Sequence, residues 1–401
     1  MRLVALAWRY LWARPLVAAL NLALLSLGVA AMSFVIVVSE QLEHSVQRDL
    51  AGIDLVVGAK GSPLQLILAG VFHLDVPTGN IPLEAVKTLR EHPLVERVVP
   101  LSLGDSLRGF RIVGSTLQYP ALYRAQLADG SYWKDKLQAV LGADVARDTG
   151  LQTGDRFIGT HGLGLGGESH GDTPYAVVGR LARCGCVLDR LVLTDLQSVW
   201  AVHETALATD AADQKLLEAE REVTLLLVGY RTPLAAVSLP RWVNAQEGLQ
   251  AAAPALESAR LLRMVGAGTD VLQGFGFVLL LAAAASVFVG LVHAVREREP
   301  DLAMLRMLGA PPRRVAALVM AEALWLALLG ALIGLVLGQG LTGLLGWELA
   351  RQRSLHVTGW WWSAQQVFVL AGTMALAVLA AAWPAWRALR LDVSRLMQAP
   401  R

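Results

Sequence analysis

Residues 296–338 read REREPDLAMLRMLGAPPRRVAALVMAEALWLALLGALIGLVLG, and this stretch decides how the chain is organised. The stretch begins with charged residues directly after a long apolar run, and a short amphipathic helix is predicted over 302–308. Residues 309–312, Gly-Ala-Pro-Pro, end that helix because glycine and two prolines do not fit a helix interior. The basic pair Arg313 and Arg314 then precedes a second apolar run. A short helix between two membrane spans is typical of a handle by which a water-soluble partner moves the spans.

Four segments are long and apolar enough to cross a bilayer, which takes about 20 residues in a helix. They cover 16–38, 271–295, 315–347 and 360–386, and Glu322 is the only charged residue in them. Because lipid offers no partner to a bare peptide group, each segment has to be helical. The chain of 401 residues is 55% hydrophobic and only 17% charged, which predicts a membrane protein. A net charge of +2 gives no reason to expect a nucleic-acid partner.

Arginine placement predicts the orientation, since short cytoplasmic loops carry an excess of basic residues. The arginines gather before the first span, between the second and third, and after the fourth: Arg2, Arg9, Arg14, Arg296, Arg298, Arg306, Arg313, Arg314, Arg387, Arg390, Arg395 and Arg401. Four spans place these three segments on one side, so both termini and the tail 387–401 are expected in the cytoplasm. A short loop at 348–359 then lies outside. Residues 1–15 are either an interfacial helix or a plain basic flank.

The block between the first two spans is predicted to fold as an α+β head at 55–244, carried on stalk helices at 39–54 and 245–270. Strands are expected at 55–58, 97–101, 110–114, 175–178, 191–194 and 223–228, and helices at 83–90, 138–149 and 195–203, the last capped by Asp195. The predicted fold class is therefore a membrane protein with four transmembrane α-helices and a large α+β extracytoplasmic domain, inserted on helical stalks between spans one and two.

The head carries no motif for nucleotide binding or covalent catalysis, since neither GxxxxGK[ST] nor GxSxG occurs. Imidazole and thiolate groups around a glycine-rich stretch are candidate metal ligands: His161, His170, Cys184 and Cys186. Their spacing fits no established metal signature. We expect a Cys-x-Cys bridge to be strained, which would leave both thiols free. A metal or redox site and an ordinary loop stay open as alternatives.

The third span carries two further features. Glu322 is expected to pair with Arg313, Arg314 or a tail arginine near the interface, the alternatives being a proton or substrate relay or a polar contact between helices. Three glycines recur at every fourth residue and predict a face for close helix packing, either between two copies or against another span: Gly330, Gly334 and Gly338.

The order of one span, a large domain and three clustered spans, with the phrase LRMLGAPPRRVAALVMAEALWLALLGALIGLVLG at 305–338, resembles the FtsX/MacB-like permeases. These are the transmembrane subunits of type VII ABC transporters. The residues that match the family pattern are 305–308, Gly309, Arg313, Arg314, Glu322, Gly330 and Gly334. The head segments VVGAKGSPLQLILAGVFHLDVPTGNI at 56–81 and GFRIVGS at 109–115 resemble a bacterial subgroup of these permeases.

The resemblance implies a dimer of two permease copies that binds cytoplasmic ATPase subunits, which hold the ATP and Mg²⁺. The loop 296–314 would be the coupling helix, and the residues implied to dock on the ATPase are Glu299, Asp301, Leu302, Leu305, Arg306, Leu308 and Gly309. Because only a short segment precedes the first span, we expect the nucleotide-binding subunit to be another polypeptide, with no cofactor and no enzymatic activity on this chain.

The resemblance also implies a multi-pass protein of the bacterial inner membrane, in contact with lipid, whose large domain is periplasmic and meets a periplasmic or outer-membrane protein. ATP-driven motion would be transmitted to the head, a mechanism termed mechanotransmission, for export, lipoprotein handling or envelope signalling. The alternative is a membrane-anchored periplasmic receptor or scaffold that binds a ligand or metal without an ATPase.

Overall fold

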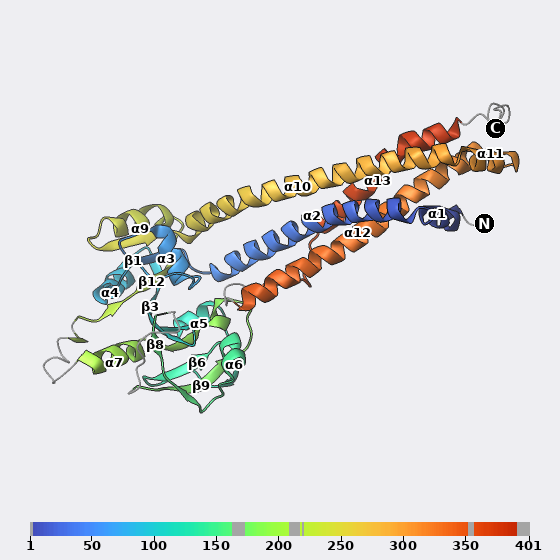
Figure 1. The fold of residues 1–401 in the computed structure, drawn as a ribbon. Helices are drawn as coiled ribbons and strands as arrows, with labels where there is room; N and C mark the ends of the chain where they lie inside the picture. Colours follow the sequence, from blue (N-terminus) through green and yellow to red (C-terminus); the bar gives the residue numbers. More distant parts are fainter. Residues whose placement is uncertain (1–2, 163–172, 208–216, 219, 352–356, 391–401) are drawn as a thin grey trace. The chain divides into compact units, whose positions relative to one another are not determined.

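The computed structural model describes residues 3–162, 173–207, 217–218, 220–351 and 357–390. The chain forms two compact units (Figure 1). The membrane unit comprises Met1–Glu43 and Met264–Arg401, and the head comprises His44–Arg263. Two long helices, α2 (Pro15–Asp49) and α10 (Pro254–Glu297), each contain residues of both units.

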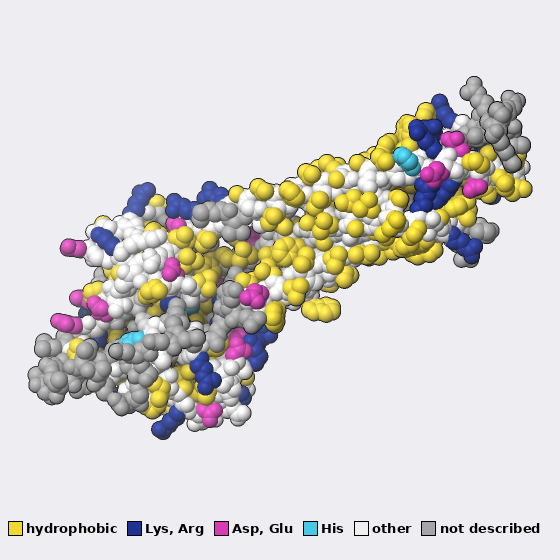
Figure 2. All heavy atoms as spheres, viewed as in Figure 1, with side chains coloured by type: hydrophobic (Ala, Val, Ile, Leu, Met, Phe, Trp, Pro, Cys, Tyr) yellow, Lys and Arg dark blue, Asp and Glu magenta, His cyan; other side chains and the backbone are white. Residues whose placement is uncertain are grey.

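Four helices of the described chain are long and apolar enough to cross a membrane: α2, α10, α12 (Pro312–Arg351) and α13 (Gln365–Leu389). The first three contain the predicted spans 16–38, 271–295 and 315–347, and α13 overlaps the predicted span 360–386. Large apolar side chains remain exposed along them, among them Phe275, Val336 and Phe368. Figure 2 shows hydrophobic side chains along the surface of the long helices. Such an outward apolar surface suits lipid, which competes with no hydrogen bond of the helix.

The fourth helix begins at Gln365, later than the predicted start at 360, because a reciprocal cap sets its first turn. The Gln365 N–H donates to Ser363 Oγ over 3.1 Å, and the Ser363 N–H donates to Gln366 Oε1 over 3.2 Å. These two bonds satisfy backbone donors that a helix start leaves open.

Two short helices complete the membrane unit, α1 (Leu3–Leu11) and α11 (Glu299–Met307). In α1, Ala7 and Leu11 are buried, and the Trp8 ring lies 5.1 Å from the Trp325 ring of α12, centroid to centroid. Helix formation over the first residues is thus confirmed for Leu3–Leu11, and α1 packs on a span. Its position at a membrane interface stays a prediction.

The predicted stalk helices are only partly correct. Helix α2 ends at Asp49, and Gly52 with φ +80° follows in the turn. Residues 245–270 are not one helix: Leu249–Ala252 form strand β13, and α10 begins at Pro254. The alanines there favour a helix, but the backbone of β13 pairs with β1 (Leu55–Ala59), with Ala251 opposite Val57, and this pairing outweighs the local preference.

The head is built on one mixed sheet with strand order β13-β1-β12-β3-β4-β10-β6-β9-β5. The remaining strands are β2 (Ile81–Pro82), β3 (Val95–Leu107), β4 (Phe110–Ser115), β5 (Leu127–Gly130), β6 (Gln138–Leu141), β7 (Arg156–Phe157), β8 (Thr160–His161), β9 (Tyr175–Leu181), β10 (Val192–Asp195), β11 (Glu222–Val223) and β12 (Leu225–Tyr230). Strand β7 pairs with β9 and β8 with β3, while β11 and β2 form a separate pair. Pairing is antiparallel except for β4 with β10 and β6 with β9.

Both faces of the sheet are covered. Along β12, Leu225 and Leu227 enter one core with α3 (Pro63–Gly70), whereas Leu226 and Val228 enter a second core with α4 (Glu84–Glu91) and α9 (Ala235–Asn244). This alternation follows from the period of two in a strand. The helices of the head are α3 (Pro63–Gly70), α4 (Glu84–Glu91), α5 (Gln118–Leu122), α6 (Ala143–Thr149), the 3₁₀ turn η1 (Val187–Arg190), α7 (Leu196–Leu207) and α9 (Ala235–Asn244). The predicted α+β class is confirmed.

Every predicted strand overlaps an observed strand, but the predicted helix at 138–149 is wrong in its first third. Residues Gln138–Leu141 form β6 between β10 and β9, and α6 starts only after Gly142, whose backbone is extended. A Cβ on Gly142 would lie 2.2 Å from the Leu188 carbonyl oxygen, so the residue at this break has to be glycine. The Asp195 cap is confirmed, because its Oδ1 accepts the Gln197 N–H over 2.8 Å.

Candidate functional site

The candidate site is the segment that reverses the chain between α10 and α12. Its helix α11 starts after Arg298, with Pro300 in the first turn, where the missing N–H costs nothing, and with Glu299 and Asp301 where acidic groups favour the helix dipole. Gly309 has φ +92°, a left-handed conformation that glycine adopts without strain, and it ends the helix. The predicted short helix and its glycine stop are confirmed.

One face of α11 is fixed to the bundle and the other is free for contact. Leu302 is 3% exposed and packs with Val295, Val315 and Leu318, and Leu305 is half-buried beside them. A Leu302 side chain enclosed by its own bundle offers no surface to an ATPase, so its predicted docking role does not fit this burial. It anchors the helix instead.

The outward surface of α11, which we call the coupling face, consists of Asp301, Met304, Met307 and Leu308. Leu308 is 80% exposed and Met304 57%. Covering two exposed methionines and a leucine with an apolar partner is energetically favourable. Of the predicted docking residues, Asp301, Leu308 and Gly309 are exposed, while Glu299 and Arg306 are partly covered. Docking by these residues stays a prediction.

A buried ion pair holds the start of α11. The Arg298 Nη1 donates to Glu322 Oε1 of α12 over 2.8 Å, and the two side chains are only 14% and 8% exposed. The Arg298 Nη2 donates to the Tyr10 carbonyl of α1 over 2.9 Å, and its guanidinium carbon lies 4.5 Å from the centre of the Tyr10 ring. A single arginine thus joins α1, α11 and α12.

Pairing of Glu322 with an arginine is confirmed, but the partner is neither Arg313 nor Arg314, and the tail residues Arg395 and Arg401 lie outside the described residues. Arg313 and Arg314 are exposed on the same helix as Glu322. They precede it by two turns or more, about 12 Å at 1.5 Å per residue, which is too far for a direct contact. Arg298 reaches Glu322 because the reversal at 309–312 returns the chain beside its own start, a juxtaposition that no local spacing announces.

Two weaker contacts surround this pair. Arg14, just before α2, forms an ion pair with Glu297, and Arg387 of α13 lies 3.9 Å from Glu299. Because these side chains are more exposed, each pair contributes at most about 1 kcal/mol. Residues 297–299 thus contact α1, α12, α13 and the residue that precedes α2, while Glu297 itself ends α10.

The three span glycines pack against α2. A Cβ on Gly334 would lie 2.6 Å from the Val29 Cβ and 2.7 Å from the Ser26 carbonyl oxygen, so only hydrogen fits there. The other two meet α2 in the same way, Gly330 at Leu25 and Gly338 at Ala30. Of the two predicted packing partners, another span or a second copy, the structure shows the span.

Polar residues inside the bundle were not anticipated from sequence. The Ser286 Oγ donates to Asn21 Oδ1 over 2.7 Å, and the Gln366 Nε2 donates to Ser33 Oγ over 2.6 Å. Each bond joins two helices that are far apart along the chain. Single uncharged polar residues within apolar runs were the available signal, but they do not reveal their partners.

The candidate metal ligands do not come together. His161 Nδ1 lies 3.2 Å from Asp105 Oδ1, and His170 lies outside the described residues. Within the described ranges, no three His, Cys, Asp or Glu side chains are placed to hold a metal ion. Cys184 and Cys186 form a disulfide, contrary to the expectation of free thiols. Their Cα atoms are 5.1 Å apart, inside the usual range, because Gly185 turns the chain with φ +65°.

Comparison with known proteins agrees with this architecture. The model of the MacB-like periplasmic core domain matches residues 18–224, and that of the FtsX-like permease C-terminal domain matches residues 274–393. The first match covers more than half of the chain, and the second contains α11, α12 and α13. The chain therefore belongs to the family of FtsX-like permeases with a MacB-like periplasmic core domain, the permease components of ABC transporters.

Individual relatives are distant. The pyoverdine export ATP-binding/permease protein PvdT of Pseudomonas putida is 23% identical over 371 residues, which cover 84% of this chain and 52% of that protein. The uncharacterized ABC transporter permease protein Rv0987 of Mycobacterium tuberculosis is 24% identical, with 84% and 38% covered. The chain spans about half the length of the PvdT proteins it matches.

Among solved structures, the periplasmic region of MacB from Actinobacillus actinomycetemcomitans shares 11% identity and a TM-score of 0.36, over 54% of this chain and 95% of that one. That score is too low to carry an argument.

Proposed function

We propose that this chain is a non-catalytic permease subunit that transmits the ATP-driven motion of an ATPase subunit to its periplasmic head. In this proposal the ATPase, with its ATP and Mg²⁺, is a partner of the chain and docks on the coupling face. Two permease copies form a homodimer in the bacterial inner membrane, with both termini in the cytoplasm. The work done is export, lipoprotein handling or envelope signalling.

The observation that carries the proposal is the combination of a fixed and an exposed face on α11. A lever has to be rigidly attached at one side and accessible at the other. The Arg298–Glu322 pair and the buried Leu302 attach it, while Met304, Met307 and Leu308 are exposed. Arg296, Arg313 and Arg314 flank it, as expected of a cytoplasmic loop.

Continuous helices support transmission beyond the lever. At 1.5 Å per residue, the 35 residues of α2 and the 44 residues of α10 measure about 50 and 65 Å. A bilayer core takes only about 30 Å. Each helix includes residues of the head, so an axial or tilting movement at the level of α11 has an unbroken backbone along which to pass.

The polar residues of the spans support packing rather than passage of a solute. Asn21 with Ser286 and Ser33 with Gln366 satisfy each other inside the bundle, and the glycines of α12 bring its backbone close to α2. The relatives named for pyoverdine export add export to the proposed roles, without assigning a cargo to this chain.

Co-purification tests the proposal. The full-length protein would be isolated from native membranes, and ATPase subunits in the preparation would be identified by mass spectrometry and by ATP hydrolysis. We expect Met304→Asp with Leu308→Asp to lower the recovered ATPase at least tenfold. Leu234→Asp, at a head position that is 67% exposed, is the matched control and should leave recovery unchanged.

Two results would contradict the proposal. If no ATPase accompanies the wild-type protein, or if the two α11 substitutions leave recovery and hydrolysis intact, the lever proposal fails. A stand-alone receptor or scaffold is then the better description.

A further inference from the structure

The two cysteines of the chain lie in one loop of the head, residues 182–190, which we call the cysteine loop. It connects β9 to β10 and includes the turn η1. The Cys184–Cys186 disulfide encloses a single residue, Gly185. A bond this local joins no two elements of the fold.

Its direct contribution to folding is correspondingly small. In the chain-entropy account, a disulfide that closes a three-residue loop reduces the number of conformations of the unfolded chain about 15-fold. A disulfide that closes a 15-residue loop reduces that number roughly 150-fold. Stabilisation of the folded head is therefore only a minor effect of this disulfide. Its effect has to be sought in the conformation of the cysteine loop itself.

The cysteine loop holds the end of α2. The Arg48 guanidinium donates to the carbonyl oxygen of Gly185, the residue between the two cysteines. The Val187 N–H, next to Cys186, donates to the buried Asp49 carboxylate over 3.0 Å. All of these residues belong to the head. The disulfide therefore lies beside both backbone groups that contact the last turn of α2, the Gly185 carbonyl inside the ring and the Val187 N–H one residue past it.

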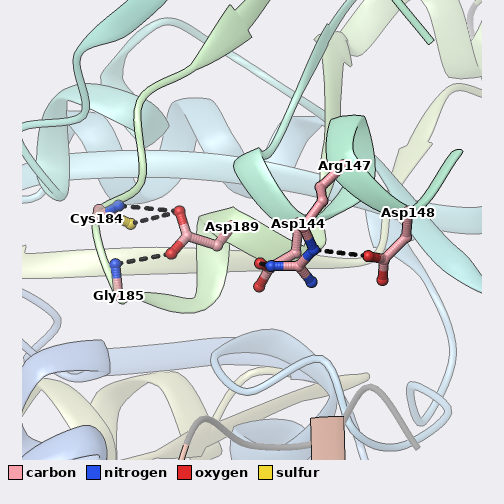
Figure 3. A network of polar contacts seen from close by, with 6 residues as sticks. All are labelled: Asp144, Arg147, Asp148, Cys184, Gly185 and Asp189. Carbon is pink, nitrogen blue, oxygen red and sulfur yellow. Dashed lines mark hydrogen bonds and ion pairs between the residues drawn. The ribbon is translucent and has the colours of Figure 1, made fainter. Parts of the chain in front are cut away.

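The surroundings of the bond suit reduction. Cys184 is half-buried, whereas Cys186 is 5% exposed, so the Cys184 sulfur is the one open to attack. The Asp189 carboxylate accepts the N–H groups of Cys184 and Gly185 over 3.0 and 2.7 Å, and one of its oxygens lies 3.4 Å from the Cys184 sulfur (Figure 3). A disulfide sulfur has no proton to donate to that oxygen, but a thiol has. Asp189 can therefore form a hydrogen bond that exists only in the reduced state.

We propose that the Cys184–Cys186 disulfide is a redox-exchangeable bond, reduced by a small dithiol oxidoreductase, and that its reduction releases the cysteine loop from the end of α2. This site is independent of the coupling face and of the cargo. The head would respond to the redox state of its compartment by loosening its hold on one of the two helices that enter the membrane unit.

The exchange balances in two steps. A thiolate of the oxidoreductase attacks the Cys184 Sγ, the S–S bond breaks, and Cys186 leaves as a thiolate that takes a proton from water. The second thiol of the oxidoreductase then loses its proton and attacks the oxidoreductase sulfur of the mixed disulfide, so that Cys184 leaves as a thiolate and takes up a proton. Two electrons pass to the loop, which ends as two thiols, while the oxidoreductase ends as a disulfide.

Thiol counting on the full-length protein in detergent tests the chemistry. The protein would be treated under native conditions with a thioredoxin-class dithiol protein or with dithiothreitol. It would then be labelled with a maleimide, and its mass would be measured by mass spectrometry. We expect two labels per chain to appear together. If the cysteines are labelled only after denaturant is added, the proposal is overturned.

Hydrogen exchange tests the consequence. On reduction, peptides covering 46–50 and 183–190 should exchange about tenfold faster, whereas β12 peptides stay protected. The double variant Cys184→Ser/Cys186→Ser should show the fast exchange without reductant and no response to it. Thiols that appear without faster exchange, or a double variant as protected as the oxidised protein, would refute the release. Neither readout needs an ATPase, so the proposed transport role can fail separately.

Discussion

Removing the carboxylate of Glu322 should destabilise the membrane unit by about 3–4 kcal/mol. The contact between Arg298 and Glu322 is 2.8 Å long, and both side chains are largely buried. For charge centres about 4 Å apart, an effective dielectric constant of 20 gives about 4 kcal/mol. Removing one member of a buried pair typically costs 3–5 kcal/mol, because the other charge stays behind without compensation.

The remaining contacts of Arg298 limit the loss. In Glu322→Ala its guanidinium keeps the Tyr10 carbonyl and ring, so the lower part of that range is expected. Glu322→Gln keeps a neutral acceptor and should cost about 1–2 kcal/mol, the difference between a charge-assisted and an ordinary hydrogen bond. Asp301→Asn, at an exposed acid of the same segment, is the matched control; it loses only the favourable interaction of a first-turn acid with the helix dipole and should cost less than about 1 kcal/mol.

A double-mutant cycle measures the pair itself. Unfolding of the purified protein by sodium dodecyl sulfate, followed by circular dichroism, would be compared for Arg298→Met, Glu322→Leu and the two combined. An apolar replacement of both partners should recover most of the stability that either single variant loses. A coupling energy below about 0.5 kcal/mol, the scatter between independent sites, would refute the view that this pair fixes α11.

Two further outcomes are expected. Gly334→Ala should destabilise the bundle by about 1–3 kcal/mol in the same detergent assay, because the new methyl group meets Val29 at 2.6 Å. Gly340→Ala in the same helix is the control and should be neutral, since its methyl group meets nothing within 4 Å. Equal effects of the two substitutions would contradict the packing face. In the head, burial lowers the pKa of His73, which is hydrogen-bonded to Tyr119 over 2.8 Å, well below its usual 6.5. At low pH the unfolded chain then binds a proton that the folded head does not. The free energy of unfolding should therefore fall by about 1.4 kcal/mol per pH unit as the pH drops below about 6. Measured by hydrogen exchange of head peptides from about pH 7 to 5, this stability should depend less steeply on pH in His73→Asn than in the wild-type protein.

The sequence was sufficient for the spans, the short helix between the second and third spans, and the class of the head. The spans follow from apolar length, because lipid leaves a peptide group no alternative to the helix. The coupling segment follows from the charges at 296–301 and the Gly-Ala-Pro-Pro break, which are local signals. The strands of the head follow from short apolar runs between turn residues, since most of them are buried on both faces.

Errors arose where a distant partner overruled a local preference. Leu249–Ala252 became a strand because β1 was available beside it, and Gln138–Leu141 because β9 and β10 flank it. The disulfide was misjudged because the positive φ of Gly185, which brings the two cysteines together, is not visible in the spacing Cys-x-Cys.

By itself, then, the order of residues determined that this protein crosses a membrane with four helices, carries an α+β domain and presents a short helix between two spans. These features depend on solvent preference and on neighbours within a few positions. Only the tertiary structure decided that Arg298 neutralises Glu322, that Gly334 lies against Val29, and that the cysteine loop grips the end of α2. Those contacts join residues from 24 to more than 300 positions apart, and their energy depends on distance in space, which no periodicity along the chain encodes.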